Sequence, residues 1–144
     1  ADPALALEGE APGRGAALWR MDYGAELGPP QPFARPAGRP DGSVLDAEGC
    51  LWNAEFGGGR VVRYRPDGTP DMVVRAPVRY TTCAGFGGDD MQTLYITDAT
   101  PFAYQRLSRK HRADLPDGYA GGLFSVRLPV RGAAERRFRH GSLS

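Results

Sequence analysis

Residues 51–55 read Leu-Trp-Asn-Ala-Glu, and residues 94–98, at an offset of 43 positions, read Leu-Tyr-Ile-Thr-Asp. A second pair recurs at the same offset, with Leu-Trp-Arg-Met at 18–21 and Val-Val-Arg-Tyr at 61–64. A third copy of this second strand, Leu-Phe-Ser-Val, lies at 123–126 after a longer spacing. A repeat of this length with about four short strands is typical of a β-propeller blade. The alternative is a β-sandwich whose strands are alike by chance.

The pattern around these repeats predicts an all-β chain. Apolar residues do not recur at helical spacing over any long window, whereas short apolar runs end at Gly, Pro and Asp. Trp52 and Trp19 are expected to be aromatics that pack between blades. The runs predict strands at 50–55, 60–65, 72–76 and 123–128, separated by turns at Ala47-Glu48-Gly49, Gly57-Gly58-Gly59 and Pro66-Asp67-Gly68.

The repeats divide the chain into parts of a β-propeller domain. We expect outer strands of one blade in residues 1–38, a blade at 41–76, another blade at 81–128, and a tail at 129–144. A propeller needs about four blades or more to close around its axis. Because two to three blades would leave apolar faces in water, we expect either missing N-terminal blades or self-association.

Composition excludes several classes of protein. The chain has 144 residues, of which 41% are hydrophobic and 24% charged, as in ordinary globular domains. A net charge of +1 does not favour a nucleic-acid partner, and no apolar run approaches the ~20 residues that span a membrane. Cys50 and Cys83 match no metal-ligand spacing. Free thiols in a cytoplasmic protein are expected rather than a disulfide.

The order of several motifs carries a family resemblance. Residues 39–54 read Arg-Pro-Asp-Gly-Ser-Val-Leu-Asp-Ala-Glu-Gly-Cys-Leu-Trp-Asn-Ala, and Gly-Gly-Arg-Val-Val-Arg-Tyr-Arg-Pro-Asp-Gly follows at 58–68. Phe-Gly-Gly at 86–88, Thr-Leu-Tyr-Ile-Thr at 93–97 and Gly-Gly-Leu-Phe at 121–124 continue the series. In this order the sequence resembles the C-terminal half of gluconolactonase, regucalcin (senescence marker protein) and luciferin-regenerating enzyme. The resemblance implies a six-bladed propeller with one divalent metal, Ca²⁺ or Zn²⁺, that hydrolyses sugar lactones to aldonic acids.

The resemblance places one metal ligand of the family at Asp41, within Pro40-Asp41-Gly42. Hard divalent cations prefer oxygen ligands, and a bound cation makes water a better nucleophile near neutral pH. Asp41 is therefore predicted to bind the metal and to act in catalysis by taking the proton of the attacking water. The alternative is a turn aspartate that caps its own backbone.

The other acidic residues are interpreted as structural. Asp46 and Glu48 are expected in a hairpin turn, and the two further Pro-Asp-Gly motifs, which contain Asp67 and Asp117, are expected to be ordinary turns. The basic residues of the 101–120 insert are interpreted as a solvated loop rather than a rim that attracts a sugar acid.

One carboxylate does not hold a catalytic metal by itself, so this chain alone should lack normal activity. Two alternatives to a lactonase therefore stay open, a non-catalytic metal-binding propeller module and an inactive truncated fragment.

Overall fold

The computed structural model describes residues 16–99 and 121–134 of the chain. Within these two ranges the chain forms nine β-strands and no helix, so the prediction of an all-β protein is confirmed. The strands are β1 (Leu18–Arg20), β2 (Gln31–Ala34), β3 (Arg39–Leu45), β4 (Leu51–Phe56), β5 (Arg60–Tyr64), β6 (Pro70–Arg75), β7 (Thr81–Gly87), β8 (Thr93–Asp98) and β9 (Leu123–Arg127).

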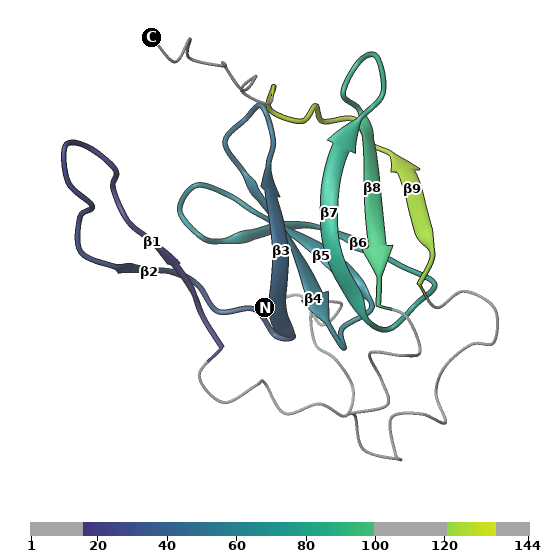
Figure 1. Ribbon diagram of the computed structural model, residues 1–144, viewed down its shortest axis with the longest axis horizontal. Coiled ribbons are helices and arrows are strands. Elements are labelled where there is room, and N and C mark those ends of the chain that lie inside the picture. The colour runs from purple at the N-terminus through teal and green to yellow at the C-terminus, as the bar shows by residue number, and fades with distance from the viewer. Residues whose placement is uncertain (1–15, 100–120, 135–144) are drawn as a thin grey trace, which may run out of the picture.

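The strands form three antiparallel sheets, in the orders β1-β2, β3-β4-β5-β6 and β7-β8-β9 (Figure 1). Every pairing joins strands that are consecutive among the described residues. The predicted strands at 50–55, 60–65, 72–76 and 123–128 correspond to β4, β5, β6 and β9. Strands β4 and β8, which carry the repeated Leu-Trp and Leu-Tyr motifs, each occupy the second position of their sheet.

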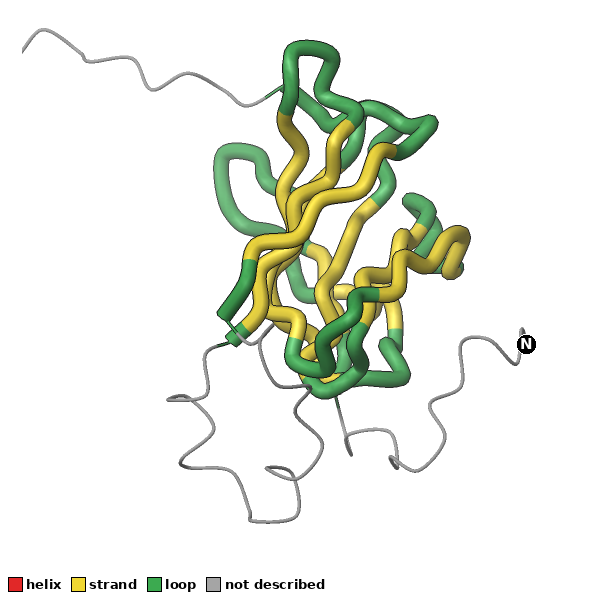
Figure 2. Tube along the Cα trace, turned by 90° about the vertical axis from the view of Figure 1, so that its right-hand side faces the viewer, coloured by secondary structure: helices red, strands yellow, loops and turns green. Residues whose placement is uncertain are grey.

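The main hydrophobic core lies between the second and third sheets, where β7 packs against β3 and β4 (Figures 1 and 2). Trp52 is fully buried in this core, and its ring meets that of Phe86 edge-on at 5.6 Å between centroids. After β9 the chain returns across this interface. Leu128 and Val130 join the core, and Gly132 forms a β-bridge with Asp46. Residues far apart in the sequence therefore hold the two sheets together.

The β1–β2 hairpin is less enclosed and extends away from the other sheets (Figure 1). A small cluster centred on Ala34, Val62 and Tyr64 joins it to the second sheet. Trp19 on β1 is 56% exposed. The interpretation of Trp52 as a packing aromatic is thus confirmed, whereas that of Trp19 stays a prediction, because no described segment covers its ring.

All three predicted turns have glycines in the left-handed region that favours this residue, and in the turn at 57–59 these are Gly57 with φ 84° and Gly59 with φ 60°. Gly49 has φ 76° in the β3–β4 hairpin, and Gly68 has φ 84° between β5 and β6.

Cys50 and Cys83 are both free thiols, the first buried and the second exposed. No helix that could span a membrane is found among residues 16–99 and 121–134.

Candidate metal-ligand site at Asp41

A β-bulge in strand β3 sets the position of Asp41. The register between β3 and β4 shifts between Pro40 and Ser43, so that β3 has two residues opposite one residue of β4. A bulge leaves a residue without its ladder partner and turns its side chain in a new direction. The Pro-Asp-Gly sequence at residues 40–42 therefore lies inside a strand and is not a free turn.

Gly42 brings this bulge into close contact with strand β7. A Cβ atom at Gly42 would lie 2.5 Å from Cys83 Sγ and 2.8 Å from the carbonyl oxygen of Thr82. Real Cβ atoms do not approach other atoms so closely, so only glycine fits here. Asp41 is consequently held at the contact between the second and third sheets.

The Asp41 carboxyl group borders an open cavity of about 210 Å³ that is also lined by Arg39, Pro40 and Phe56. The guanidinium carbon of Arg39 lies 6.0 Å from the centre of the Phe56 ring, in cation–π contact. Partial burial raises the pKa of Asp41 above its ordinary value of 3.8, and Arg39 and the N–H of Gly42 offset only part of this rise. The carboxyl group thus combines access from solvent with a desolvation cost that its neighbours offset only in part.

Asn53 on strand β4 holds the backbone of this bulge. Its Nδ2 donates to the carbonyl oxygen of Asp41 at 2.9 Å and to Ser43 Oγ at 2.8 Å. Asn53 is fully buried. Asn53 was not predicted to have a role, although the sequence held one signal, since it is the only asparagine in the chain and lies within a predicted strand rich in apolar residues.

Asp46, five residues after Asp41, has a different environment. It is 2% exposed and accepts hydrogen bonds from Trp52 Nε1 at 2.9 Å and from Arg63 Nε at 2.8 Å, as well as from the backbone N–H groups of Glu48 and Cys50. Arg63 also pairs with Glu48 at 2.6 Å and with Asp71. The prediction that Asp46 and Glu48 are structural is confirmed by this network, which fixes the β3–β4 hairpin.

The second Pro-Asp-Gly motif is the turn that the sequence predicted. Asp67 Oδ1 accepts from the backbone N–H of Thr69 at 2.9 Å and from Thr69 Oγ1 at 2.6 Å, a local arrangement that closes the turn. Asp117 lies outside the described residues, as does the whole insert at residues 101–120.

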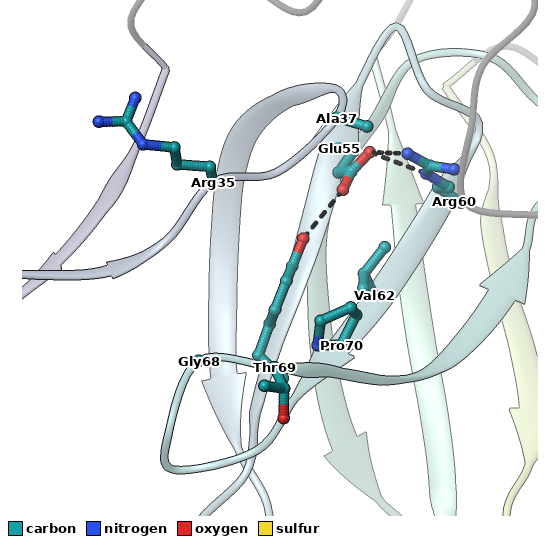
Figure 3. Close-up of a pocket in the computed structure, with 9 residues that line it drawn as sticks. Arg35, Ala37, Glu55, Arg60, Val62, Gly68, Thr69 and Pro70 are labelled. Atoms are coloured by element: carbon teal, nitrogen blue, oxygen red, sulfur yellow. Dashed lines mark hydrogen bonds and ion pairs between the residues drawn. The ribbon is translucent and has the colours of Figure 1, made fainter. Parts of the chain in front are cut away.

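A larger cavity of about 290 Å³ opens beside Glu55 (Figure 3). Its polar groups bind one another. The Glu55 carboxylate accepts from Arg60 Nε at 2.8 Å, from Tyr64 Oη at 3.2 Å and from the N–H of Gly38 at 2.9 Å. Burial, with the adjacent Glu55 carboxylate, raises the pKa of Tyr64. Because Glu55 and Arg60 are buried and paired, this cavity offers fewer groups for chemistry than the one at Asp41.

Within residues 16–99 and 121–134, no three His, Cys, Asp or Glu side chains gather in a group that could hold a metal ion. A carboxylate oxygen is a suitable ligand for Ca²⁺ or Zn²⁺, so Asp41 fits as one ligand. Among the described residues Asp41 is thus a single candidate oxygen ligand without a second or third ligand grouped beside it.

Comparison with known proteins identifies the family. Residues 13–100 match the SMP-30/gluconolactonase/LRE-like region. The chain belongs to this family, and the resemblance inferred from its motifs is confirmed.

Two relatives and one solved structure illustrate the similarity. The chain is 43% identical over 107 residues to 6-deoxy-6-sulfogluconolactonase of Pseudomonas putida, a match covering 74% of this chain and 35% of that protein. It is 40% identical over 126 residues to L-arabinolactonase of Azospirillum brasilense, covering 84% and 39% respectively. The crystal structure of the calcium-binding protein regucalcin from Agrobacterium tumefaciens matches with a TM-score of 0.71 at 31% identity, over 88% of this chain and 43% of that chain.

These matches also define the extent of the similarity. The chain spans 35% of the first relative and 39% of the second. Its relatives include proteins named as sugar lactonases, which places the chain in a family with lactone hydrolases.

Proposed function

We propose that this chain supplies Asp41 as one ligand of a divalent metal in a sugar lactonase. The observation that carries the proposal is the setting of the Asp41 carboxyl group, which borders a cavity and forms no ion pair with any described residue. Asp46, Glu55 and Asp71 contrast with it, because each is bound to an arginine. A carboxylate that is left accessible beside a cavity can bind a cation.

In the proposed reaction Asp41 has two roles. It contributes an oxygen ligand, and it accepts the proton of the water molecule that attacks the lactone carbonyl carbon. The ring C–O bond then breaks, and the departing oxygen takes up a proton to give the hydroxy acid. When bound, a divalent cation polarises the carbonyl group and lowers the pKa of bound water.

The names of the relatives support a sugar lactone as the substrate class, since one acts on a sulfogluconolactone and another on arabinolactone. Regucalcin is described as a calcium-binding protein, which supports Ca²⁺ as the metal, with Zn²⁺ as the alternative. We further propose that the three sheets are successive blades of a six-bladed propeller and form its last two to three blades. The exposed Trp19, Tyr23 and Leu27 on the β1–β2 hairpin support packing against further chain.

A non-catalytic metal-binding module is the second candidate, because one structural neighbour is described only as calcium-binding. The two candidates make the same prediction for metal affinity and opposite predictions for turnover. A third candidate, an inactive fragment, predicts neither metal binding nor lactone turnover.

The test uses the intact gene product that contains these residues. Calcium and zinc affinities are measured by calorimetry, and acid release from gluconolactone and arabinolactone is followed by pH-stat. We expect Asp41→Ala to reduce metal affinity by more than the roughly 10–100-fold that loss of an outer-shell partner costs, with a parallel loss of turnover. Asp67→Ala is the matched control, since it removes the same carboxylate from the same tripeptide and should change neither quantity.

The outcomes separate the candidates. Metal binding without acid release would support the binding module. Full metal affinity in Asp41→Ala, or no metal binding by the wild-type protein, would overturn the proposal.

A further inference from the structure

Strand β3 lacks its regular backbone pairing at Asp41, and a side chain replaces it. The bulge interrupts the register between Pro40 and Ser43. At this point the Asn53 side-chain amide donates to the carbonyl oxygen of Asp41 at 2.9 Å, and the Ser43 hydroxyl lies 3.5 Å from the same oxygen. Asn53 Nδ2 also donates to Ser43 Oγ at 2.8 Å, so one amide joins both sides of the bulge.

The burial of Asn53 is unusual for a residue that only supports a strand. It is 0% exposed, and its neighbours Trp52 and Ala54 are equally buried in the hydrophobic core. Asn53 Oδ1 is buried without a hydrogen-bond partner among the described residues. Leaving a buried acceptor unpaired costs free energy, so an apolar β-branched residue would serve stability better at this position.

The opposite side of the bulge is fixed as well. Gly42 lies against Cys83 and the carbonyl oxygen of Thr82 so closely that no Cβ atom fits between them. The peptide group that joins Asp41 to Gly42 is therefore confined by strand β7 on one side and by the Asn53 amide on the other. A confined backbone fixes the position from which the Asp41 side chain extends and the direction of its Cα–Cβ bond.

From this arrangement we propose that Asn53 is a positioning residue for Asp41, which sets the carboxylate in its metal-binding orientation without touching the metal or the substrate. The inference rests on the proposed function of Asp41 as a metal ligand. Groups that orient a metal ligand from outside its coordination sphere influence metal affinity strongly, and their loss typically weakens it 10–100-fold.

The first experiment substitutes Asn53→Val in the intact gene product and measures Ca²⁺ affinity by calorimetry. Valine suits a buried strand and removes only the amide. We expect Ca²⁺ binding to weaken about 10–100-fold, and lactone turnover to recover towards the wild-type rate when the Ca²⁺ concentration is raised to saturation. Thr97→Val is the matched control, because it removes the hydroxyl bond between Thr82 and Thr97 on neighbouring strands without affecting Asp41.

A second measurement uses the wild-type protein, so it does not depend on the folding of a variant. Selective ¹⁵N-asparagine labelling limits the side-chain NH₂ signals to those of asparagines, and Asn53 gives the one signal that comes from these 144 residues. We expect this signal to shift and its exchange with solvent to slow as Ca²⁺ is added, because the Asp41 backbone becomes more rigid.

The results distinguish failure of the inference from failure of the proposed function. Unchanged Ca²⁺ affinity in a folded Asn53→Val protein, or an NH₂ signal that does not respond to Ca²⁺ binding, overturns the positioning role and leaves Asp41 as a ligand. A wild-type protein that binds no divalent metal overturns the proposed function and this inference together.

Discussion

The tripeptide Pro-Asp-Gly is present twice among the described residues, at 40–42 and at 66–68, and the two copies have different backbone structures. At 66–68 it forms a turn in which Asp67 binds the backbone and hydroxyl of Thr69. At 40–42 it lies in a bulged strand, where Asp41 borders a cavity and its carbonyl oxygen is held by Asn53. The local sequence is the same, and the difference arises from the strands that surround each copy.

The glycines explain how the surroundings act. Gly68 has φ 84°, a conformation that itself makes a turn, and it closes the connection between β5 and β6. Gly42 does not have a positive φ and is required because β7 lies against it. Asp67 binds the backbone and hydroxyl of the nearby Thr69, whereas Asp41 borders a cavity and forms no ion pair with any described residue.

The largest expected effect is a loss of stability on substitution of a third aspartate, Asp46, whose carboxylate has a structural role. Asp46→Ala removes the buried partner of Arg63 and the acceptor of the Trp52 indole N–H. Breaking a buried ion pair on one side costs about 3–5 kcal/mol of unfolding free energy, and urea unfolding measures this loss. Metal affinity of the remaining folded protein should be unchanged.

Glu48→Ala provides the matched control, since Glu48 pairs with the same arginine but its side chain is 64% exposed. An exposed pair contributes about 0–1 kcal/mol, so this variant should unfold near the wild-type midpoint. Equal losses of unfolding free energy in the two variants would show that the buried pair of Asp46 with Arg63 stabilises the fold no more than the exposed pair of Glu48 does.

Much of the fold was predictable because it depends on local chemistry. Strands β4, β5 and β9 follow from short apolar runs, and the turns at 47–49 and 66–68 follow from their glycines. The return of residues 128–132 into the main core could not be predicted, since it depends on contacts with Asp46 and Phe86 that no periodic pattern encodes.

The candidate site was predicted only in part. Asp41 could be distinguished from Asp67 by the family resemblance, whereas the tripeptide itself is identical in both. The roles of Asn53 and Gly42 could not be inferred, because one depends on a shift in strand register and the other on contact with Cys83 of another sheet. The contact between Gly42 and Cys83 joins residues that are distant in the sequence, and it has no local signature.

Alanine at the two glycines should separate stability from metal binding. Gly68→Ala combines an unfavourable φ with a Cβ atom 1.8 Å from the Phe33 carbonyl oxygen, which predicts a loss of roughly 2–4 kcal/mol with metal affinity retained. Gly42→Ala crowds Cys83 and should cost about 1–3 kcal/mol, yet weaken metal binding because Asp41 moves. Thermal unfolding and calorimetry measure the two quantities.

Gly85→Ala in strand β7 is the control for both variants, because no atom lies within 4 Å of the added Cβ. It should leave stability and metal affinity close to their wild-type values. If Gly68→Ala weakened metal binding more than Gly42→Ala, the distinction between the turn copy and the bulge copy would be wrong.

The smallest expected effect is a pH dependence that again contrasts the aspartates. Burial alone would raise the pKa of Asp46, but hydrogen bonds from Trp52 and Arg63 outweigh it and hold the pKa below the ordinary 3.8. A carboxyl group with a lowered folded pKa contributes stability above its unfolded pKa of about 3.9, and this contribution is lost as the pH falls through the folded value. The stability gap between wild type and Asp46→Ala should therefore be full at pH 7 and narrow below about pH 4.

Comparing these two proteins cancels the titration of the aspartates that they share. Asp41 and Asp98 have raised pKa values, which oppose the trend from Asp46 in the stability of either protein alone. Urea unfolding at several pH values between 7 and 3 gives the gap directly. A gap that stayed constant down to pH 3 would mean that the hydrogen bonds from Trp52 and Arg63 do not favour the ionised form of Asp46.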